Sequence, residues 1–145
     1  MFGWWLACLL LRPSQAFYTT ASQAGRYPSS QAFAALGVDG SIVAWGDEDS
    51  GGLPPWKTDE NDANYPTDSG YVLLVTNDHA FAALKGDGTI SVWGSTYAGG
   101  QQNDVPTAKV YTNIFSASCS FAALAADGTL TPWGCGEAGG GDTPP

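Results

Sequence analysis

The sequence is poor in positive charge: 5 Lys and Arg residues stand against 14 Asp and Glu residues, and the net charge is −9. Binding to nucleic acid needs Lys and Arg gathered on one face of the protein. The basic residues are instead scattered along the chain, at Arg12, Arg26, Lys57, Lys85 and Lys109. This composition argues against nucleic acid as a partner, and against electrostatic attachment to an anionic membrane.

Residues that carry catalysis or bind metals are also scarce. The sequence has one histidine, His79, and three cysteines that are not in Cys-x-x-Cys spacing, which argues against a zinc site. The run Asp47-Glu48-Asp49-Ser50-Gly51 begins like a calcium-binding loop, but Thr58 stands where an EF-hand needs its bidentate glutamate. We therefore predict a protein that is not an enzyme and that has no catalytic residue, cofactor or metal site.

Long hydrophobic runs are lacking as well. The longest begins the chain, Met1 to Leu11, and is too short for a bilayer core, which needs about 20 residues. Its length and the small residues Ser14 and Ala16 fit a signal peptide over residues 1–16, although no Lys or Arg precedes the run. The alternative is a ragged start or a strand of a preceding repeat. The compartment, secreted or cytoplasmic, stays open.

What the sequence does contain is a threefold repeat. A motif Phe-Ala-Ala-Leu, two variable residues, Asp-Gly, four variable residues and Trp-Gly occupies residues 33–46, 81–94 and 121–134, and a Gly-Gly pair follows each copy. The tryptophans are offset by 48 and 40 residues, which is the spacing of β-propeller blades. The repeated positions are Phe33, Asp39, Gly40, Trp45, Phe81, Asp87, Gly88, Trp93, Phe121, Asp127, Gly128 and Trp133.

Each copy is predicted to be a β-hairpin that turns at Asp-Gly, because glycine adopts positive φ without a steric penalty. In the second copy this register places Leu84 opposite Ile90 and Phe81 opposite Trp93. One face of each hairpin is then aliphatic, the other carries aromatic and small residues, and both should be covered. Segments rich in β-branched and aromatic residues precede the second and third copies, whereas the first copy lacks such a lead-in and should be incomplete.

This motif resembles the repeat of the regulator of chromosome condensation family, over roughly residues 30–141. The resemblance implies an all-β fold of antiparallel hairpins, in an incomplete propeller of about three blades where the family usually has seven. The Gly-Gly segments depart from the Gly-Gln-Leu-Gly segment that is usual in the family. We expect a possible signal peptide or ragged start at 1–16, propeller-type repeats at 17–141, and a frayed tail at 142–145.

The expected function is a non-catalytic module that binds another protein, as a fragment of a larger propeller. Two alternatives stay open: a secreted inhibitor or adhesion protein of propeller type, and a scaffold for guanine-nucleotide exchange on a small GTPase. Open blade edges could also support self-association. Cys119 and Cys135 lie opposite each other in the hairpin register, about 4.5 Å apart if their pair is not hydrogen-bonded. Either a disulfide or two buried thiols would fit.

Overall fold

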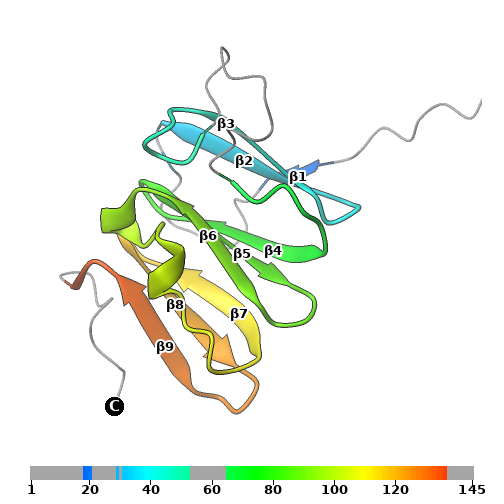
Figure 1. Ribbon diagram of the computed structural model, residues 1–145, viewed down its shortest axis with the longest axis vertical. Helices are drawn as coiled ribbons and strands as arrows, with labels where there is room; N and C mark the ends of the chain where they lie inside the picture. The colour runs from blue at the N-terminus through cyan, green and yellow to red at the C-terminus, as the bar shows by residue number, and fades with distance from the viewer. Residues whose placement is uncertain (1–17, 21–28, 30, 53–64, 137–145) are drawn as a thin grey trace, which may run out of the picture.

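The residues that the structure describes form three antiparallel sheets of three strands each, stacked in the order of the sequence (Figure 1). The structure is a computed structural model and describes residues 18–20, 29, 31–52 and 65–136. The first sheet contains β1 (Tyr18–Thr20), β2 (Ala32–Gly37) and β3 (Ile42–Gly46). The second contains β4 (Tyr71–Thr76), β5 (Ala80–Lys85) and β6 (Ile90–Gly94). The third contains β7 (Tyr111–Ser116), β8 (Ser120–Ala125) and β9 (Leu130–Gly134).

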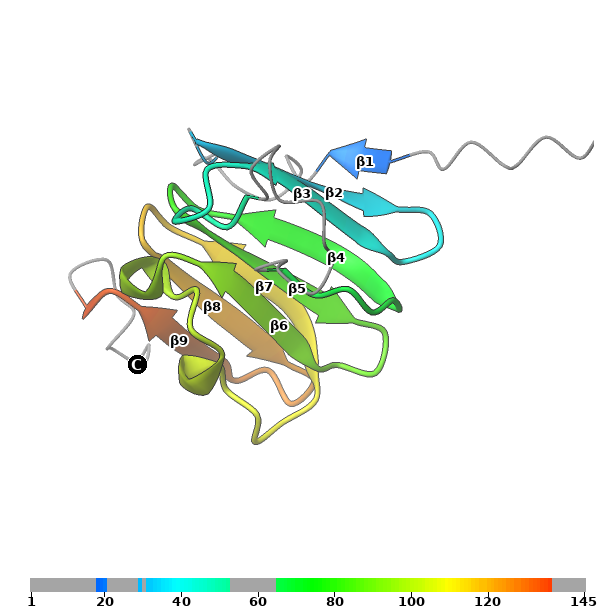
Figure 2. The same ribbon diagram turned by 45° about the horizontal axis from the view of Figure 1, so that its top comes forward.

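The sheets meet face to face, and the second lies between the other two in both views (Figures 1 and 2). β4 contacts β2 on one side and β7 on the other. Two short 3-10 helices, η2 (Thr96–Ala98) and η3 (Gln102–Asp104), follow β6 and contact β9 and β6, respectively. This all-β stack of antiparallel hairpins is an incomplete β-propeller of three blades, which confirms the predicted fold class.

The register of the three hairpins is the predicted one. Phe81 pairs with Trp93 and Leu84 with Ile90, and the other two hairpins repeat these pairs. In the second hairpin the Gly88 N–H donates to the Lys85 carbonyl at 3.0 Å, and Gly88 has a φ of 86°. This is a type I turn closed by a left-handed glycine.

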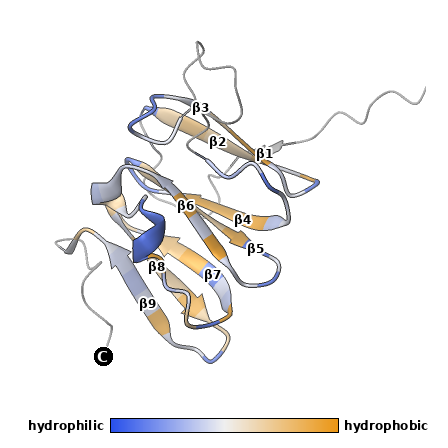
Figure 3. Cartoon of the chain, viewed as in Figure 1, coloured by the Kyte–Doolittle hydropathy of each residue, from blue (hydrophilic) through white to orange (hydrophobic). Residues whose placement is uncertain are grey.

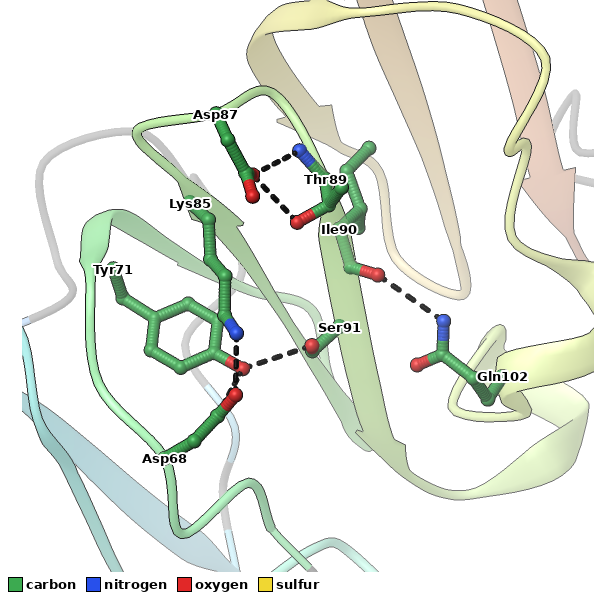
Figure 4. Close-up of polar contacts among 8 residues, drawn as sticks. All are labelled: Asp68, Tyr71, Lys85, Asp87, Thr89, Ile90, Ser91 and Gln102. Atoms are coloured by element: carbon green, nitrogen blue, oxygen red, sulfur yellow. Dashed lines mark hydrogen bonds and ion pairs between the residues drawn. The ribbon is translucent and has the colours of Figure 1, made fainter.

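The aspartate of each turn organises the residue beyond it. Asp87 Oδ1 accepts hydrogen bonds from the Thr89 N–H at 3.0 Å and from the Thr89 hydroxyl at 2.7 Å (Figure 4). Asp39 with Ser41 and Asp127 with Thr129 do the same. These hydrogen bonds lower the pKa of the Asp87 carboxyl below its usual value, with smaller contributions from Lys85 and its own backbone. The Asp-Gly pairs thus stabilise their own turns.

The first blade has a lead-in strand, although its sequence predicted none. β1 is described over Tyr18–Thr20, and β4 and β7 over six residues each. β1 pairs Tyr18 with Gly37, the position that lies opposite Tyr71 and Tyr111 in the other blades, but it lacks the register shift that follows those two tyrosines. The described part of the lead-in strand thus precedes residues 21–28 in the sequence, the segment that lacks strand alternation.

Two clusters of buried side chains lie at the two blade junctions. At the first junction the aliphatic face of β2 and β3 packs on the face that carries Phe81 and Trp93. At the second, the aliphatic face of β5 and β6 packs on the face that carries Phe121 and Trp133. Every junction therefore joins an aliphatic face to an aromatic face. Among the described residues, both faces are covered by neighbouring blades in the middle blade alone, whereas the sequence predicted this for all three.

Candidate functional site

Each of the two blade junctions contains a hydrogen bond between a tryptophan and the Gly-Gly pair of the preceding blade. The Trp93 indole N–H donates to the Gly51 carbonyl at 3.0 Å, and the Trp133 indole N–H donates to the Gly99 carbonyl at 3.1 Å. A Cβ on Gly51 would lie 2.8 Å from Trp93 Cδ1, so no larger residue fits without a shift. The sequence showed the Gly-Gly repeat but gave it no role.

The second glycine of each pair lies against its own blade. A Cβ on Gly52 would meet Gly46 at 2.5 Å, and a Cβ on Gly100 would meet Gly94 at 2.6 Å. The Gly-Gly turn is therefore wedged between the Trp-Gly end of one blade and the aromatic face of the next. This explains why the pair recurs at a fixed place after each tryptophan.

The aromatic pairs have the same geometry in all blades but different surroundings. Ring centroids are 5.6 Å apart for Phe33 and Trp45, 5.2 Å for Phe81 and Trp93, and 5.3 Å for Phe121 and Trp133. The last two pairs are at most 3% exposed, whereas Phe33 is 57% and Trp45 47% exposed. We call the surface of Phe33, Val43 and Trp45 the leading face.

In the third blade it is the other, aliphatic face that is exposed to solvent. Leu130 is 37% and Phe115 45% exposed, whereas the equivalent residues of the second blade, Ile90 and Val75, are at most 7% exposed. We call the surface of Phe115, Ala122, Leu130 and Pro132 the trailing face. Figure 3 shows the apolar residues of the strands that contribute to it. The stack of described blades thus has one exposed aromatic face and one exposed aliphatic face.

The outer edges of the blades are less open than the sequence suggested. The Gln102 side chain pairs with the free edge of β6, since its amide accepts from the Val92 N–H and donates to the Ile90 carbonyl, both at 3.1 Å. Gln102 thereby replaces part of a further strand. The equivalent of Val92 in the third blade is Pro132, which pairs with Ala122 and has no N–H to expose. This suits β9, which is the outer strand of its sheet.

Cys119 and Cys135 are joined by a disulfide with their Cα atoms 5.7 Å apart. The spacing of about 4.5 Å considered for a pair without hydrogen bonds was wrong, because this pair is hydrogen-bonded. The Cys135 N–H donates to the Cys119 carbonyl at 3.0 Å, and hydrogen-bonded pairs have the wider spacing, about 5.5 Å. Gln31 and His79, the equivalents of Cys119, use their carbonyls in the same way.

A network of polar side chains lies where the second blade begins (Figure 4). Lys85 pairs with Asp68, and the Tyr71 hydroxyl donates to Asp68 at 2.8 Å and lies 2.9 Å from the Ser91 hydroxyl. The hydrogen bonds from Lys85 and Tyr71 lower the pKa of Asp68, and the hydrogen bond to Asp68 raises the pKa of Lys85. Burial is the largest effect that raises the pKa of the Tyr71 hydroxyl. The network positions β4 and contains no nucleophile with a base beside it.

The acidic turn after the first blade is a structural turn that borders an open hollow of about 600 Å³. Asp47 Oδ2 accepts from the Ser50 N–H at 3.0 Å, and the Ser50 hydroxyl donates to Gln31 at 3.0 Å. Across the described residues, no group of three or more His, Cys, Asp or Glu side chains is placed to hold a metal ion. The hollow is lined by Glu48, Asp49, Val92, Trp93, Gly94, Ser95, Thr96, Gly100 and Gln102.

No helix within the described part of the chain is long and apolar enough to cross a bilayer. The expected signal peptide or ragged start at 1–16, the Gly139-Gly140 pair and the tail at 142–145 lie outside the described residues.

No family model matches the chain, and no curated protein matches it. Solved structures do. The ectodomain of the Physcomitrella patens receptor kinase CR4 has a TM-score of 0.52 and 20% identity, over 74% of this chain and 27% of its own. The CRINKLY WD40 ectodomain of the Arabidopsis thaliana receptor kinase ACR4 has a TM-score of 0.51 and 16% identity, over 74% and 34%. Yeast RCC1 bound to Kap60 has a TM-score of 0.48 and 22% identity, over 72% and 28%.

The two ectodomains show the fold: the chain is built of β-propeller blades. The chain spans about a quarter to a third of the length of these solved structures.

Proposed function

We propose that this chain is a non-catalytic, protein-binding array of propeller blades that forms part of a larger propeller. The observation that carries the proposal is the exposure of the Phe33 and Trp45 pair, whose equivalents are buried against another blade at both junctions. Aromatic residues on an exposed apolar patch mark protein-binding surfaces. In the family we propose, the regulator of chromosome condensation repeats, such a face is covered by a further blade.

The rest of the described chain supports binding rather than catalysis. The recurring aspartates hold their own turns, and Lys85 and Lys109 are paired with Asp68 and Asp127. The net charge of −9 disfavours nucleic acid and anionic membranes as partners. A protein is the partner that fits apolar faces bordered by acidic turns.

Site-specific photo-crosslinking tests this proposal. A benzophenone amino acid at Val43 lies on the leading face, and the same substitution at Val38 lies at the hairpin tip of the same blade. Both valines are exposed, 38% and 72%, so Val38 is a matched control. We expect crosslinks to defined protein partners from position 43 in the native source, and few from position 38. Equal yields from both positions, or none from position 43, would contradict a protein-binding face.

A secreted binding or inhibitory protein is a second candidate. It is favoured by the disulfide between Cys119 and Cys135, because disulfides persist in oxidising compartments. The nucleotide-exchange alternative has no such observation in its favour.

A further inference from the structure

The leading and trailing faces are the two halves of a junction that the chain already makes twice. The leading face carries the stacked Phe33 and Trp45, as the covered faces carry Phe81 with Trp93 and Phe121 with Trp133. The trailing face is the equivalent of the aliphatic face on which Phe121 and Trp133 pack. The leading face thus resembles the aromatic faces that are buried at the two junctions. The trailing face resembles the aliphatic faces that cover them.

The trailing face is also hollowed where an aromatic residue would be received. A hollow of about 170 Å³ lies there, with Phe115, Ala122 and Pro132 in its wall. The equivalent residues of the second blade, Val75, Ala82 and Val92, belong to the core cluster that contains Phe121 and Trp133. A volume of about 150 Å³ is enough to hold benzene, so the hollow has room for one aromatic ring.

Backbone groups at the turn end of the blades repeat the pattern. The carbonyl of the turn glycine accepts from a tyrosine N–H of the next blade at 3.1 Å, from Gly40 to Tyr71 and from Gly88 to Tyr111. Gly128 is the third turn glycine, and a Cβ placed on it would meet nothing within 4 Å. Tyr18 lies opposite Gly37, as Tyr71 and Tyr111 lie opposite Lys85 and Ala125, but β1 lacks the register shift that follows those two tyrosines. The Gly128 carbonyl is thus the trailing equivalent of the two turn-glycine acceptors.

We infer that the trailing face of one copy of this chain binds the leading face of a second copy, head to tail. This inference rests on the proposed protein-binding role of the faces and names the partner. The occupant of the trailing face is the Phe33 and Trp45 pair of the second copy. The two contacting surfaces are different, so the contact is heterologous and can extend to further copies.

The copies carry like charge, −9 each, while their contacting faces are apolar. Salt screens the repulsion between exposed charges and leaves apolar burial in place. Association should therefore strengthen as the salt concentration rises, which is the opposite of an association driven by ion pairs. This salt dependence separates an apolar junction from an adhesion of charged loops.

Complementation of two blocked variants of the 145-residue chain tests the inference. Val43→Arg blocks the leading face, and Leu130→Arg blocks the trailing face, each at a partly exposed site. We expect the unaltered chain to form species that grow with concentration in sedimentation velocity, and each variant alone to stay monomeric. An equimolar mixture should form a heterodimer and nothing larger. An unpaired charge in a junction should weaken association by more than about tenfold.

Further variants separate the effect of a blocked face from that of an added charge or a folding defect. Val38→Arg adds the same charge at a hairpin tip and should associate like the unaltered chain. The double variant Val43→Arg, Leu130→Arg should form no homodimer. Near-ultraviolet circular dichroism reports whether each variant is folded, and Val43→Gln and Leu130→Gln replace any variant that is not.

An unaltered chain that stays monomeric at its highest soluble concentration would overturn the inference. So would a mixture that stays monomeric, or a single blocked variant that dimerises with itself. In each case, a crosslink from position 43 to a different protein would leave the proposed binding function standing. The two proposals therefore fail separately.

Discussion

The indole N–H of Trp93 donates to the carbonyl of Gly51 in the turn that follows the preceding blade, at 3.0 Å. Trp133 and Gly99 form the same contact one blade later. A buried hydrogen bond of this kind fixes how far one blade is rotated against the next, because the indole is held in a stack with its phenylalanine. The Trp-Gly and Gly-Gly motifs are therefore two sides of one junction.

Replacing Gly51 with alanine should destabilise the protein by about 2–4 kcal/mol, because a crowded Cβ is added at a left-handed backbone position. Gly51 has a φ of 89°, and its Cβ would lie 2.8 Å from Trp93 Cδ1. Gly86→Ala is the matched control, since its Cβ would approach Val72 no closer than 3.7 Å. Urea unfolding measures both variants. Equal losses of stability would show that the Gly-Gly turn is not a tight junction.

Replacing Gln102 with alanine should cost about 1–2 kcal/mol, because the Val92 N–H and the Ile90 carbonyl lose their partner. The neighbouring Gln101→Ala removes a similar exposed side chain and should change the free energy of unfolding by less than about 0.5 kcal/mol. The comparison is made by urea unfolding under identical conditions. A larger effect for Gln101 would mean that edge capping by Gln102 has been misassigned.

Acid should weaken the start of the second blade. The pKa of Asp68 is lowered in the folded state by hydrogen bonds from Lys85 and Tyr71. Its contribution is therefore fully present above the unfolded pKa of 3.8 and is lost as pH falls through the lower folded pKa.

The pair of Asp68 and Lys85 is exposed to solvent, so this contribution should be about 0.2–1 kcal/mol. The gap in urea midpoint between the parent and Asp68→Asn should be open at pH 6 and close toward pH 2. A gap that is constant over this range would contradict the assigned role of the carboxylate.

The sequence predicted the hairpins well because their information is local. Asp87, Gly88 and the alternation around them specify a turn and a register within fourteen residues, 81–94. The role of Gly51 depends on Trp93, and that of Gln102 depends on the free edge of β6. Neither contact has a signal in its own segment, since the partner comes from another blade or a later turn. The recurrence of Gly-Gly after every Trp-Gly was the signal that could have revealed the first.

The spacing of Cys119 and Cys135 shows the limit of register alone. The hairpin register placed the two cysteines opposite each other. It did not tell whether their backbone groups are hydrogen-bonded, because that depends on which residues point their N–H toward the partner strand. The exposure of the terminal faces also needed the structure. Phe33 and Phe81 stand in nearly the same local sequence, and only the stacking order makes one exposed and the other buried.

Mass spectrometry of the chain from its native source tests the compartment. A secreted protein should begin at Phe17, after removal of Cys8, and should weigh two hydrogens less than the form with free Cys119 and Cys135. The disulfide closes a loop of about 15 residues, which contributes about 3 kcal/mol in the chain-entropy model. An intact Met1 with every thiol free would end the secreted alternative.

Hydroxyl-radical footprinting, read residue by residue by mass spectrometry, tests the central claim most directly. At the lowest usable concentration, Phe33 and Trp45 should be oxidised readily, while Phe81, Trp93, Phe121 and Trp133 should be protected by the blades that cover them. Raising the protein concentration should then protect Phe33 and Trp45 in turn. Equal oxidation of Trp45, Trp93 and Trp133, or protection of Trp45 at every concentration, would contradict a stack of blades with an open leading face.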